Sequence, residues 1–344
     1  MSLHPNDFIF GASTIGANIP DPDNARVLTD RDRIAQIINM GILCEQLGID
    51  AFAIGESHEA NFVTQAHTVM LAALAAATAQ IKLFSSVSVL STQDPVRVYE
   101  DFSTLSLLFP KRVNPVVGRG SRLGSYQLFN VNEAFYDDIF REKLNLLLAI
   151  NSAGINKSPL TWQGKYRSNI NNLPVLPYCD TGLNIWHAVG GSPESVLSAA
   201  KHGLPMMLTT LAGPNSSYAR MIDYYRENFV ASDILQRPKV ITTSWFFAAE
   251  SDEQAVTEFY PYFKNMNKYL RGSDVTIDFL YNCLDVNNSM MIGSIETITN
   301  KLRTQYELFN HDGFMAHLDT GCSQEEVITK NIYFFRDIIN TLKK

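Results

Sequence analysis

Short apolar runs alternate with longer helical segments along most of the chain, and this alternation restricts the possible folds more than any other feature. Each run is apolar at nearly every position, without the regular polar positions of a strand that has one face in water. Parallel strands covered by helices on both faces have this pattern. We predict about eight such strands, at residues 8–12, 49–55, 81–90, 113–117, 183–189, 205–211, 240–249 and 314–318.

These strand and helix units fit one barrel better than an open sheet. No Gly-x-Gly-x-x-Gly follows the first strand, so a dinucleotide-binding half of the Rossmann type has no support. Residues 155–181 interrupt the alternation, because the run 162–166 has hairpin character and Pro174 and Pro177 exclude a helix. We therefore predict a single (β/α)8 TIM barrel over residues 1–344, with an insertion near residues 155–181.

The composition excludes several classes of protein. Of the 344 residues, 46% are apolar, and 28 basic against 35 acidic residues give a net charge of −7. A protein that wraps nucleic acid needs a basic face, which this chain lacks. The 4 cysteines lie far apart and the 7 histidines show no common ligand spacing. We therefore expect no disulfide framework, no metal site and no nucleic-acid partner.

We expect neither a targeting segment nor a membrane segment in this sequence. Its start lacks the basic and apolar regions of a signal peptide. The most apolar stretch, residues 69–77, is too short to span a bilayer. We therefore expect a cytoplasmic protein, in a reducing compartment, that does not bind a membrane.

Small and polar residues gather where the predicted strands end. In a barrel of this kind, the residues that carry out chemistry lie at the carboxyl ends of the strands and in the loops that follow them. We therefore expect the functional site among these residues. The segments concerned are 11–13, 55–58, 85–88, 118–121 and 189–195.

The last of these segments has the features of an anion site. Ser192 suits a helix N-cap, Pro193 suits the first helical position, and Gly190 and Gly191 let backbone N–H groups approach a ligand. The N–H groups at a helix start favour an anion, and Arg119 at the end of the fourth strand offers a charged partner. Taken alone, these residues also fit a well-capped helix and a surface ion pair, but together they favour a phosphate site.

Five motifs occur in an order that is typical of one protein family. The motifs are Gly55-Glu-Ser-His-Glu59, Val87-Ser-Val-Leu-Ser-Thr-Gln-Asp-Pro-Val-Arg97, Gly118-Arg-Gly-Ser121, Gly190-Gly-Ser-Pro-Glu-Ser195 and Gly203-Leu-Pro205. In their order and spacing the chain resembles the bacterial luciferase-like monooxygenase family. The resemblance implies the luciferase-like (β/α)8 barrel, which binds reduced FMN or, in one branch of the family, a deazaflavin.

The resemblance also implies how the cofactor would be held. Arg119, Ser192 and Ser195 match the residues that bind the cofactor phosphate. The peptide bond Ser86–Val87 would be cis and would lie beneath the flavin ring. The full set of expected cofactor-binding residues is Gly11, Ala12, Ser13, Ser86, Val87, Ser88, Arg119, Gly120, Ser121, Gly190, Gly191, Ser192 and Ser195.

Glu56, Ser57 and His58 are the candidate catalytic residues. Luciferases proper carry Glu-His-His at this place, and their first histidine assists the oxygen chemistry of the flavin. This chain has Ser57 there, which argues against light emission. His58 would give or take a proton near the flavin, since imidazole titrates near neutral pH, and Glu56 would orient it. A lone histidine commonly has a structural role instead.

The activity that the resemblance implies is a flavin-dependent monooxygenase. Reduced FMN, supplied by a separate and transiently bound flavin reductase, would react with O2 to form a C4a-peroxyflavin that oxidises a small organic substrate. Related barrels often pair through helices near the second and third strands, so we expect a homodimer.

Three other functions remain open from the sequence. A deazaflavin would support hydride transfer on the same barrel, and a flavin-binding protein without turnover fits the same residues. A flavin-free hydrolase would use Glu56 and His58. The sequence does not name the substrate, although we expect its selectivity in residues 20–25, residues 59–64 and the 155–181 insertion.

Overall fold

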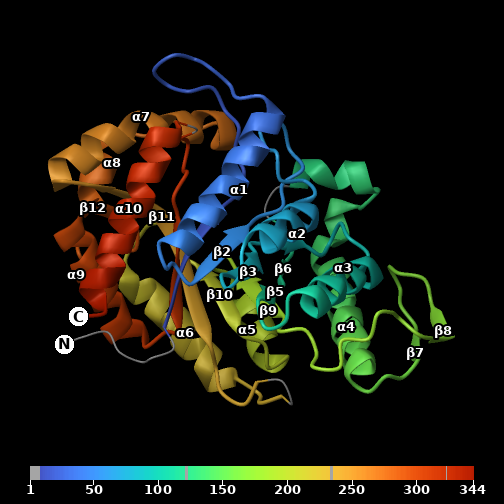
Figure 1. The fold of residues 1–344 in the computed structure, drawn as a ribbon. Helices are drawn as coiled ribbons and strands as arrows, with labels where there is room; N and C mark the ends of the chain where they lie inside the picture. Colours follow the sequence, from blue (N-terminus) through green and yellow to red (C-terminus); the bar gives the residue numbers. More distant parts are fainter. Residues whose placement is uncertain (1–7, 121–122, 233–234, 323) are drawn as a thin grey trace.

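Parallel strands follow one another around a closed ring in the computed structural model, which describes residues 8–120, 123–232, 235–322 and 324–344 (Figure 1). Most of these strands are buried along their whole length, as continuous apolar runs require. The strands of the ring are β1 (Ile9–Thr14), β2 (Ala51–Ile54), β3 (Lys82–Ser85), β4 (Ser88–Val89), β5 (Val113–Asn114), β6 (Val116–Gly118), β9 (Trp186–Val189), β10 (Met206–Thr209), β11 (Val240–Ala249) and β13 (Gly313–His317).

Two positions of the ring each consist of two short strands. β3 and β4 are the halves of one position, and β5 and β6 are the halves of the next, because β3 pairs with β5 and β4 pairs with β6. The peptide bond Ser86–Val87, which lies between β3 and β4, is cis, as predicted. β6 continues the ring to β9, and β1 pairs with both β2 and β13. The predicted TIM barrel is confirmed.

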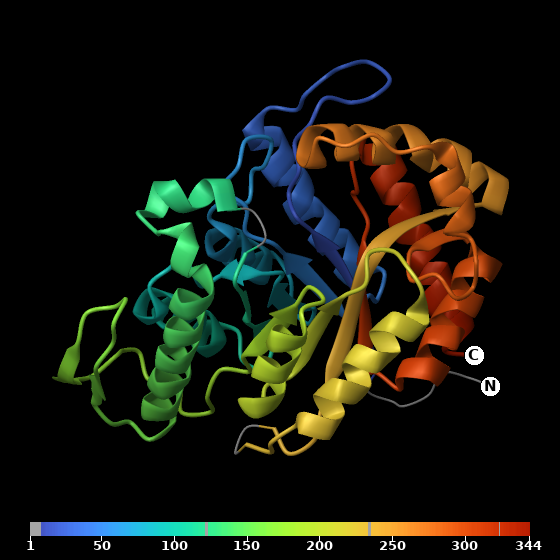
Figure 2. The same cartoon turned by 180° about the vertical axis from the view of Figure 1, so that it is seen from behind.

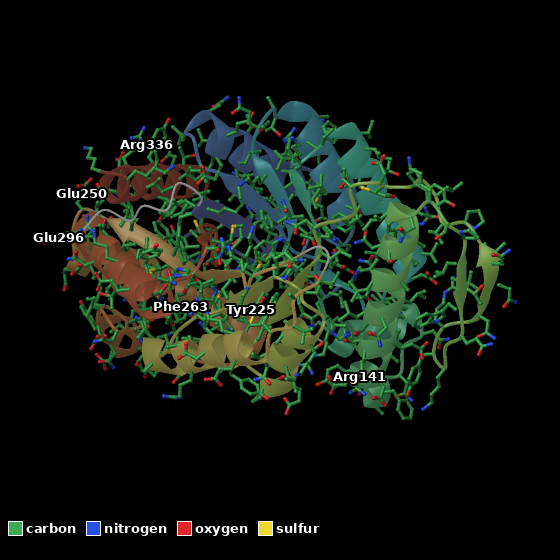
Figure 3. All side chains as sticks on the ribbon, turned by 90° about the horizontal axis from the view of Figure 1, so that it is seen from below. Arg141, Tyr225, Glu250, Phe263, Glu296 and Arg336 are labelled. Atoms are coloured by element: carbon green, nitrogen blue, oxygen red, sulfur yellow. The ribbon has the colours of Figure 1, made fainter. Side chains whose placement is uncertain are left out.

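Helices cover the outside of the ring (Figure 2). Seen from below in Figure 3, the charged side chains of Arg141, Glu296 and Arg336 lie at the periphery, whereas Tyr225 and Phe263 lie further in and are buried. Within the described ranges, no helix is both long and apolar enough to cross a bilayer. The helices are α1 (Asp30–Gln46), α2 (His67–Ala77), α3 (Pro95–Leu108), α4 (Tyr136–Ile155), α5 (Pro193–Lys201), α6 (Asn215–Asn228), α7 (Asp252–Arg271), α8 (Ile277–Asn282), α9 (Ile295–Phe309) and α10 (Glu325–Leu342), with the 3-10 helices η1 (Leu123–Phe129) and η2 (Glu133–Phe135).

Local sequence signals define where several of these helices begin. Thr29 Oγ1 accepts a hydrogen bond from the backbone N–H of Asp32 at 3.1 Å at the start of α1. Asp94 Oδ1 accepts one from the N–H of Val96 at 2.8 Å at the start of α3. Each cap satisfies a backbone donor that has no partner inside the helix. Both helix starts follow from local sequence, because a cap depends only on residues close in the chain.

The insertion forms a small antiparallel hairpin at one edge of the molecule in both Figure 1 and Figure 2. β7 (Leu160–Trp162) pairs with β8 (Ile170–Leu173), which confirms the hairpin character predicted within residues 155–181. Three kinds of element were not predicted: the short helix α8, the 3-10 helices, and β12 (Met291–Ser294), which pairs with the end of β11. Each of them is too short for a hydrophobic period to appear in the sequence.

His311 is buried in an aromatic environment between α9 and β13. Its ring is 5.1 Å from the ring of Phe8 and 5.5 Å from that of Phe309, measured between centroids. Neither ring nitrogen has a hydrogen-bond partner within the described residues. Burial therefore favours the neutral imidazole and lowers the pKa of His311 to about 3. The folded protein binds a proton at this position much less readily than the unfolded chain does.

We predict that His311 makes the fold less stable as the pH falls below about 6.5, the ordinary pKa of histidine in an unfolded chain. The unfolded state takes up a proton there and the folded state does not, so stability decreases until the pH approaches the folded pKa. Between pH 7.5 and pH 5 this loss is about 2 kcal/mol. In urea unfolding at both pH values, His311→Phe should lose less stability than the wild type. An equal loss in the two proteins would contradict the prediction.

Candidate functional site

A cavity of about 350 Å³ opens at the carboxyl ends of the barrel strands. Its walls come from residues in or after β1, β2, β4, β6, β9, β10, β11 and β13, from the cis peptide bond before β4, and from α7. A volume in this range is typical of small-molecule sites. The cavity lies where the barrel fold places chemistry, and it is the candidate functional site.

One end of the cavity combines a guanidinium group with a helix N-terminus. Arg119 lies just after β6, and its Nη2 is 3.4 Å from Oγ of Ser192, the N-cap of α5. The same Ser192 oxygen accepts a hydrogen bond from the backbone N–H of Ser195 at 3.2 Å. The positive end of the helix dipole and a cation therefore face the same space, which suits an anion. Arg119 also pairs with the half-exposed carboxylate of Asp137.

Two glycines keep this end of the cavity open. A Cβ atom placed on Gly190 would meet no atom within 4 Å. Gly191 has a φ of +115°, and a Cβ there would come no closer than 3.8 Å to another residue. A ligand can therefore lie directly against this backbone. Gly120 differs, because its φ is +81° and a Cβ would lie 2.7 Å from Cγ1 of Val89.

Glu56 is the centre of a polar network at the end of β2. Its Oε1 accepts a hydrogen bond from Nε2 of His58 at 2.6 Å, and its Oε2 accepts one from the backbone N–H of Val89 at 2.7 Å. Gln93 Nε2 donates to Oε2 as well. The carboxylate therefore holds the His58 ring and also fixes β4 beside the cis peptide bond. The sequence predicts the pairing of Glu56 with His58 but not its link to β4.

His67 is a second histidine beside Glu56, and the sequence did not identify it. Its Nδ1 is 3.6 Å from Oε2 of Glu56, and its Nε2 is 2.7 Å from Oγ of Ser88. Burial lowers the pKa of His67, the nearby charge of His58 lowers it further, and the charge of Glu56 opposes both effects. His67 begins α2, nine positions after His58, so no short spacing in the sequence links the two histidines.

Closure of the ring between β1 and β13 adds further polar groups to the site. Ser13 Oγ lies 3.1 Å from Nδ1 of His317, a cavity residue whose pKa is lowered by burial. Asp319, which also lines the cavity, forms a buried ion pair with Arg33 of α1. Thr14 Oγ1 donates to Asp319 Oδ2 at 2.5 Å. The sequence did not reveal these contacts, because their partners are about 300 residues apart.

Two buried hydroxyl groups in the cavity wall have no hydrogen-bond partner within the described residues. They are Oγ of Ser57, after β2, and Oγ1 of Thr243, in β11. A buried hydroxyl without a partner is unfavourable. A polar ligand in the cavity would satisfy both groups, so the wall fits a ligand with several hydrogen-bonding atoms.

Most of the site residues expected from the sequence come together at this cavity. Gly191 and Ser192 lie beside it, and Ser121 lies outside the described residues. The expected residues that line the cavity are Glu56, Ser57, His58, Ser86, Val87, Arg119, Gly120, Gly190 and Ser195.

Four expected cofactor residues do not line the cavity. Gly11 lies inside the barrel, where a Cβ would be 2.1 Å from Sδ of Met315, so packing explains this glycine. Ala12 is part of the apolar core, Ser13 faces His317, and Ser88 faces His67. The wall after β1 is formed by later residues of the same loop, Ile15 and Ala17.

The segments expected to determine substrate selectivity also need correction. No residue of 20–25 or of the 155–181 insertion lines the cavity, and Phe62 is the one contribution from residues 59–64. The hairpin β7–β8 lies at the edge of the molecule instead (Figure 1). β11 and α7, which were not expected at the site, contribute part of the cavity wall instead. In the described ranges, no group of three or more His, Cys, Asp or Glu side chains is placed to hold a metal ion.

Comparison with known protein sequences points to one family. A family model for luciferase-like monooxygenases matches residues 11–312. The chain is 24% identical over 240 residues to a luciferase-like monooxygenase of Escherichia coli K12, covering 70% of this chain and 66% of that protein. It is 26% identical over 231 residues to the uncharacterized protein YddN of Bacillus subtilis, covering 66% of this chain and 63% of that protein. The matches thus span just under two thirds of these relatives' own length.

Solved structures share the fold over nearly the whole chain. The monooxygenase RslO1 from Streptomyces bottropensis has a TM-score of 0.83 at 15% identity, covering 97% of this chain and 99% of its own. The oxygenating constituent of 3,6-diketocamphane monooxygenase from Pseudomonas putida, solved with FMN, has a TM-score of 0.75 at 16% identity and covers 98% of both chains. The coenzyme F420-dependent tetrahydromethanopterin reductase of Methanopyrus kandleri has a TM-score of 0.69 at 13% identity, covering 98% of this chain and 100% of its own.

We predict that alanine destabilises the fold at one glycine of the site and leaves its stability nearly unchanged at another. Gly120→Ala should reduce the free energy of unfolding by about 1–3 kcal/mol, because alanine tolerates a positive φ poorly and its Cβ would collide with Val89. Gly190→Ala should change it by less than about 0.5 kcal/mol, because the new methyl group meets nothing. Urea unfolding of both variants measures the difference. Equal losses would show that the loop after β9 is packed more tightly than described.

Proposed function

The chain belongs to the luciferase-like monooxygenase family, and from this premise we propose that it uses reduced FMN and O2 to oxidise a small organic substrate. The observation that carries the proposal is the approach of Arg119 to Ser192 at the N-terminus of α5, at 3.4 Å. This pair lies at the edge of the cavity and suits the doubly charged phosphate of FMN.

The residues present fit FMN in further respects. The open space at Gly190 and Gly191 lets backbone N–H groups approach the phosphate end. Ser57 and Thr243, whose hydroxyls have no hydrogen-bond partner within the described residues, line the same cavity, and they would provide hydrogen bonds for polar atoms of a flavin ring. Backbone at Ser86–Val87 lies in the wall, where a flat ring needs small neighbours.

Glu56 and His58 would manage protons in this site. Because His58 Nε2–H donates to the Glu56 carboxylate, Nδ1 is the nitrogen left to take or give a proton. The ring of His58 also packs edge-on against Phe129, with centroids 4.6 Å apart, which fixes its orientation. When bound, reduced FMN supplies the two electrons with which one atom of O2 enters the substrate and the other leaves as water.

The proposal includes a protein partner that supplies the cofactor. A separate flavin reductase would supply the reduced FMN, because the sequence shows no dinucleotide motif.

The proposal also includes a homodimer, in which a second copy of the chain would pair through α2 and α3. This pairing is supported by exposed apolar side chains there: Val69, Leu107 and Leu108 expose 67%, 48% and 65% of their surface.

A deazaflavin is the second candidate cofactor, since a structural neighbour is named as dependent on coenzyme F420. Hydride transfer to or from the substrate would then replace oxygen insertion. The Arg119 site suits either cofactor, because both carry a phosphate. Binding affinity for the two therefore has to be compared directly.

We predict that Arg119→Ala weakens FMN binding about 10- to 100-fold, because a charge-assisted hydrogen bond contributes about 1.5–3 kcal/mol. Gly190→Ala should also weaken binding, although its stability is unchanged. Arg141→Ala is the control, because Arg141 is an exposed residue of α4 that pairs with the exposed Asp138 and does not line the cavity. Titration of each protein with FMN and with F420, followed by flavin fluorescence, gives the affinities. Binding of F420 without FMN binding would favour the second candidate.

We predict incorporation of one oxygen atom from O2 into a product. The protein, photochemically reduced FMN and a bacterial metabolite extract are incubated under ¹⁸O2 and, in parallel, under ordinary O2. Mass spectrometry should find a product that is 2 Da heavier in the first sample, because one ¹⁸O replaces one ¹⁶O. The product should be absent with Arg119→Ala. FMN-dependent products without the label would contradict oxygen insertion.

A further inference from the structure

A buried lysine holds the β4–α3 connection, which is formed by residues 90–94. Lys143 lies in α4 and exposes 9% of its surface. Its ammonium group donates hydrogen bonds to the backbone carbonyls of Ser91 and Gln93, each at 2.7 Å. A buried cation without such acceptors would be strongly unfavourable. Lys143 therefore fastens the β4–α3 connection to α4.

The rest of α4 is fixed independently of this ammonium group. Leu144 and Leu147 are fully buried in the apolar core. The carboxylate of Glu142 accepts a hydrogen bond from the backbone N–H of Lys165 at 2.8 Å, which ties α4 to the hairpin β7–β8. Loss of the Lys143 ammonium group would therefore release the β4–α3 connection rather than the helix.

The same connection holds the carboxylate of Glu56. Its Oε2 accepts hydrogen bonds from the N–H of Val89, the last residue of β4, at 2.7 Å and from Nε2 of Gln93. The N–H of Thr92 donates to the carbonyl of Val89 at 3.1 Å, so both donors belong to one turn. The other oxygen of Glu56 accepts from Nε2 of His58. The direction of this carboxylate therefore depends on where the turn lies.

Hydrogen bonds thus link α4 to the cavity wall. They run from Lys143 to the backbone of Gln93, from the Gln93 amide to Glu56, and from Glu56 to His58. Glu56 and His58 line the cavity, whereas Lys143 and Gln93 do not. Hydrogen bonds weaken steeply when their distance and angle change, so a shift of the turn would disturb the Glu56 carboxylate.

We infer that Lys143 is a positioning residue for His58, because it holds the turn that keeps the Glu56 carboxylate in place as the acceptor of His58 Nε2–H. This inference rests on the proposed function, in which Nδ1 of His58 takes or gives a proton. Without a fixed acceptor at Nε2, the neutral ring could carry its proton on either nitrogen. Lys143 would thus determine which nitrogen of His58 is available in the cavity.

A second buried lysine distinguishes this role from a purely structural one. Lys301 of α9 is fully buried and donates to the carbonyls of Cys283 and Asp285, which follow α8. Burial lowers the pKa of both Lys143 and Lys301 to about 8, so both remain mainly protonated at pH 7. Neither Lys301 nor its two partners line the cavity. Lys301 is therefore a matched control.

The test follows the Nε2 proton of His58 by NMR at pH 7, in protein labelled with ¹⁵N-histidine and without added FMN. The chain has 7 histidines, and His58→Gln identifies the signal. Lys143→Met removes the ammonium group but keeps most of the side-chain length, and Lys301→Met makes the same change at the control. We expect the His58 proton to exchange with water about tenfold faster in Lys143→Met than in the wild type. Lys301→Met should exchange as the wild type does.

The ring ¹⁵N shifts of His58 give a second measure, because they report which nitrogen carries the proton. In the wild type and in Lys301→Met they should indicate a proton on Nε2, and in Lys143→Met a mixture of both forms. If Lys143→Met does not fold, Lys143→Gln is compared with Lys301→Gln by the same two measures. Lys143→Gln keeps an N–H donor, so its exchange should lie between those of the wild type and a full loss.

Two results would overturn the inference. One is an unchanged His58 signal in a folded Lys143 variant, and the other is equal acceleration in the Lys143 and Lys301 variants, which would indicate a general loss of stability. Failure of the proposed function gives a different result, which is the absence of FMN binding to the wild type. The exchange is measured without FMN, so the comparison still decides whether Lys143 positions His58.

Discussion

Pairing of the first strand with the last closes the ring, and the site depends on this closure. β1 and β13 lie side by side in parallel register, which brings Ser13 to His317 and Thr14 to Asp319. The buried ion pair between Arg33 and Asp319 then ties α1 to the loop after β13. Loss of one partner from such a pair costs about 3–5 kcal/mol. Without closure, the loops that follow the strands would not share one cavity.

The closed ring separates two kinds of binding surface within this cavity. One end, formed after β6 and at the start of α5, presents a guanidinium and backbone N–H groups to an anion. The other end is formed by residues of β11 and α7, among them Trp245 and Arg271. Between them, Glu56 links His58 to the backbone of β4. A cofactor with a charged tail would meet a suitable surface at the first of these ends.

Local sequence signals made much of this site predictable. Residues that serve either packing or binding, such as glycine, could not be assigned correctly from the sequence. Ser192 was predicted as a helix cap because capping depends on a few adjacent residues. Gly11 was assigned to the cofactor because it belongs to a segment of small residues at the end of the first predicted strand. Its absence of a side chain instead makes room for Met315 inside the barrel. A glycine needed for packing and a glycine needed for binding look the same in a sequence.

The sequence by itself determined the parallel barrel, the helix starts and the loops that carry the anion end. These features depend on the period of apolar residues and on contacts between residues that are close in the sequence. Only the tertiary structure decided that His67 joins Glu56, that the 155–181 hairpin lies away from the cavity, and that Arg271 enters it. They depend on how separate elements pack around the ring, and no short sequence pattern encodes which side chains then meet.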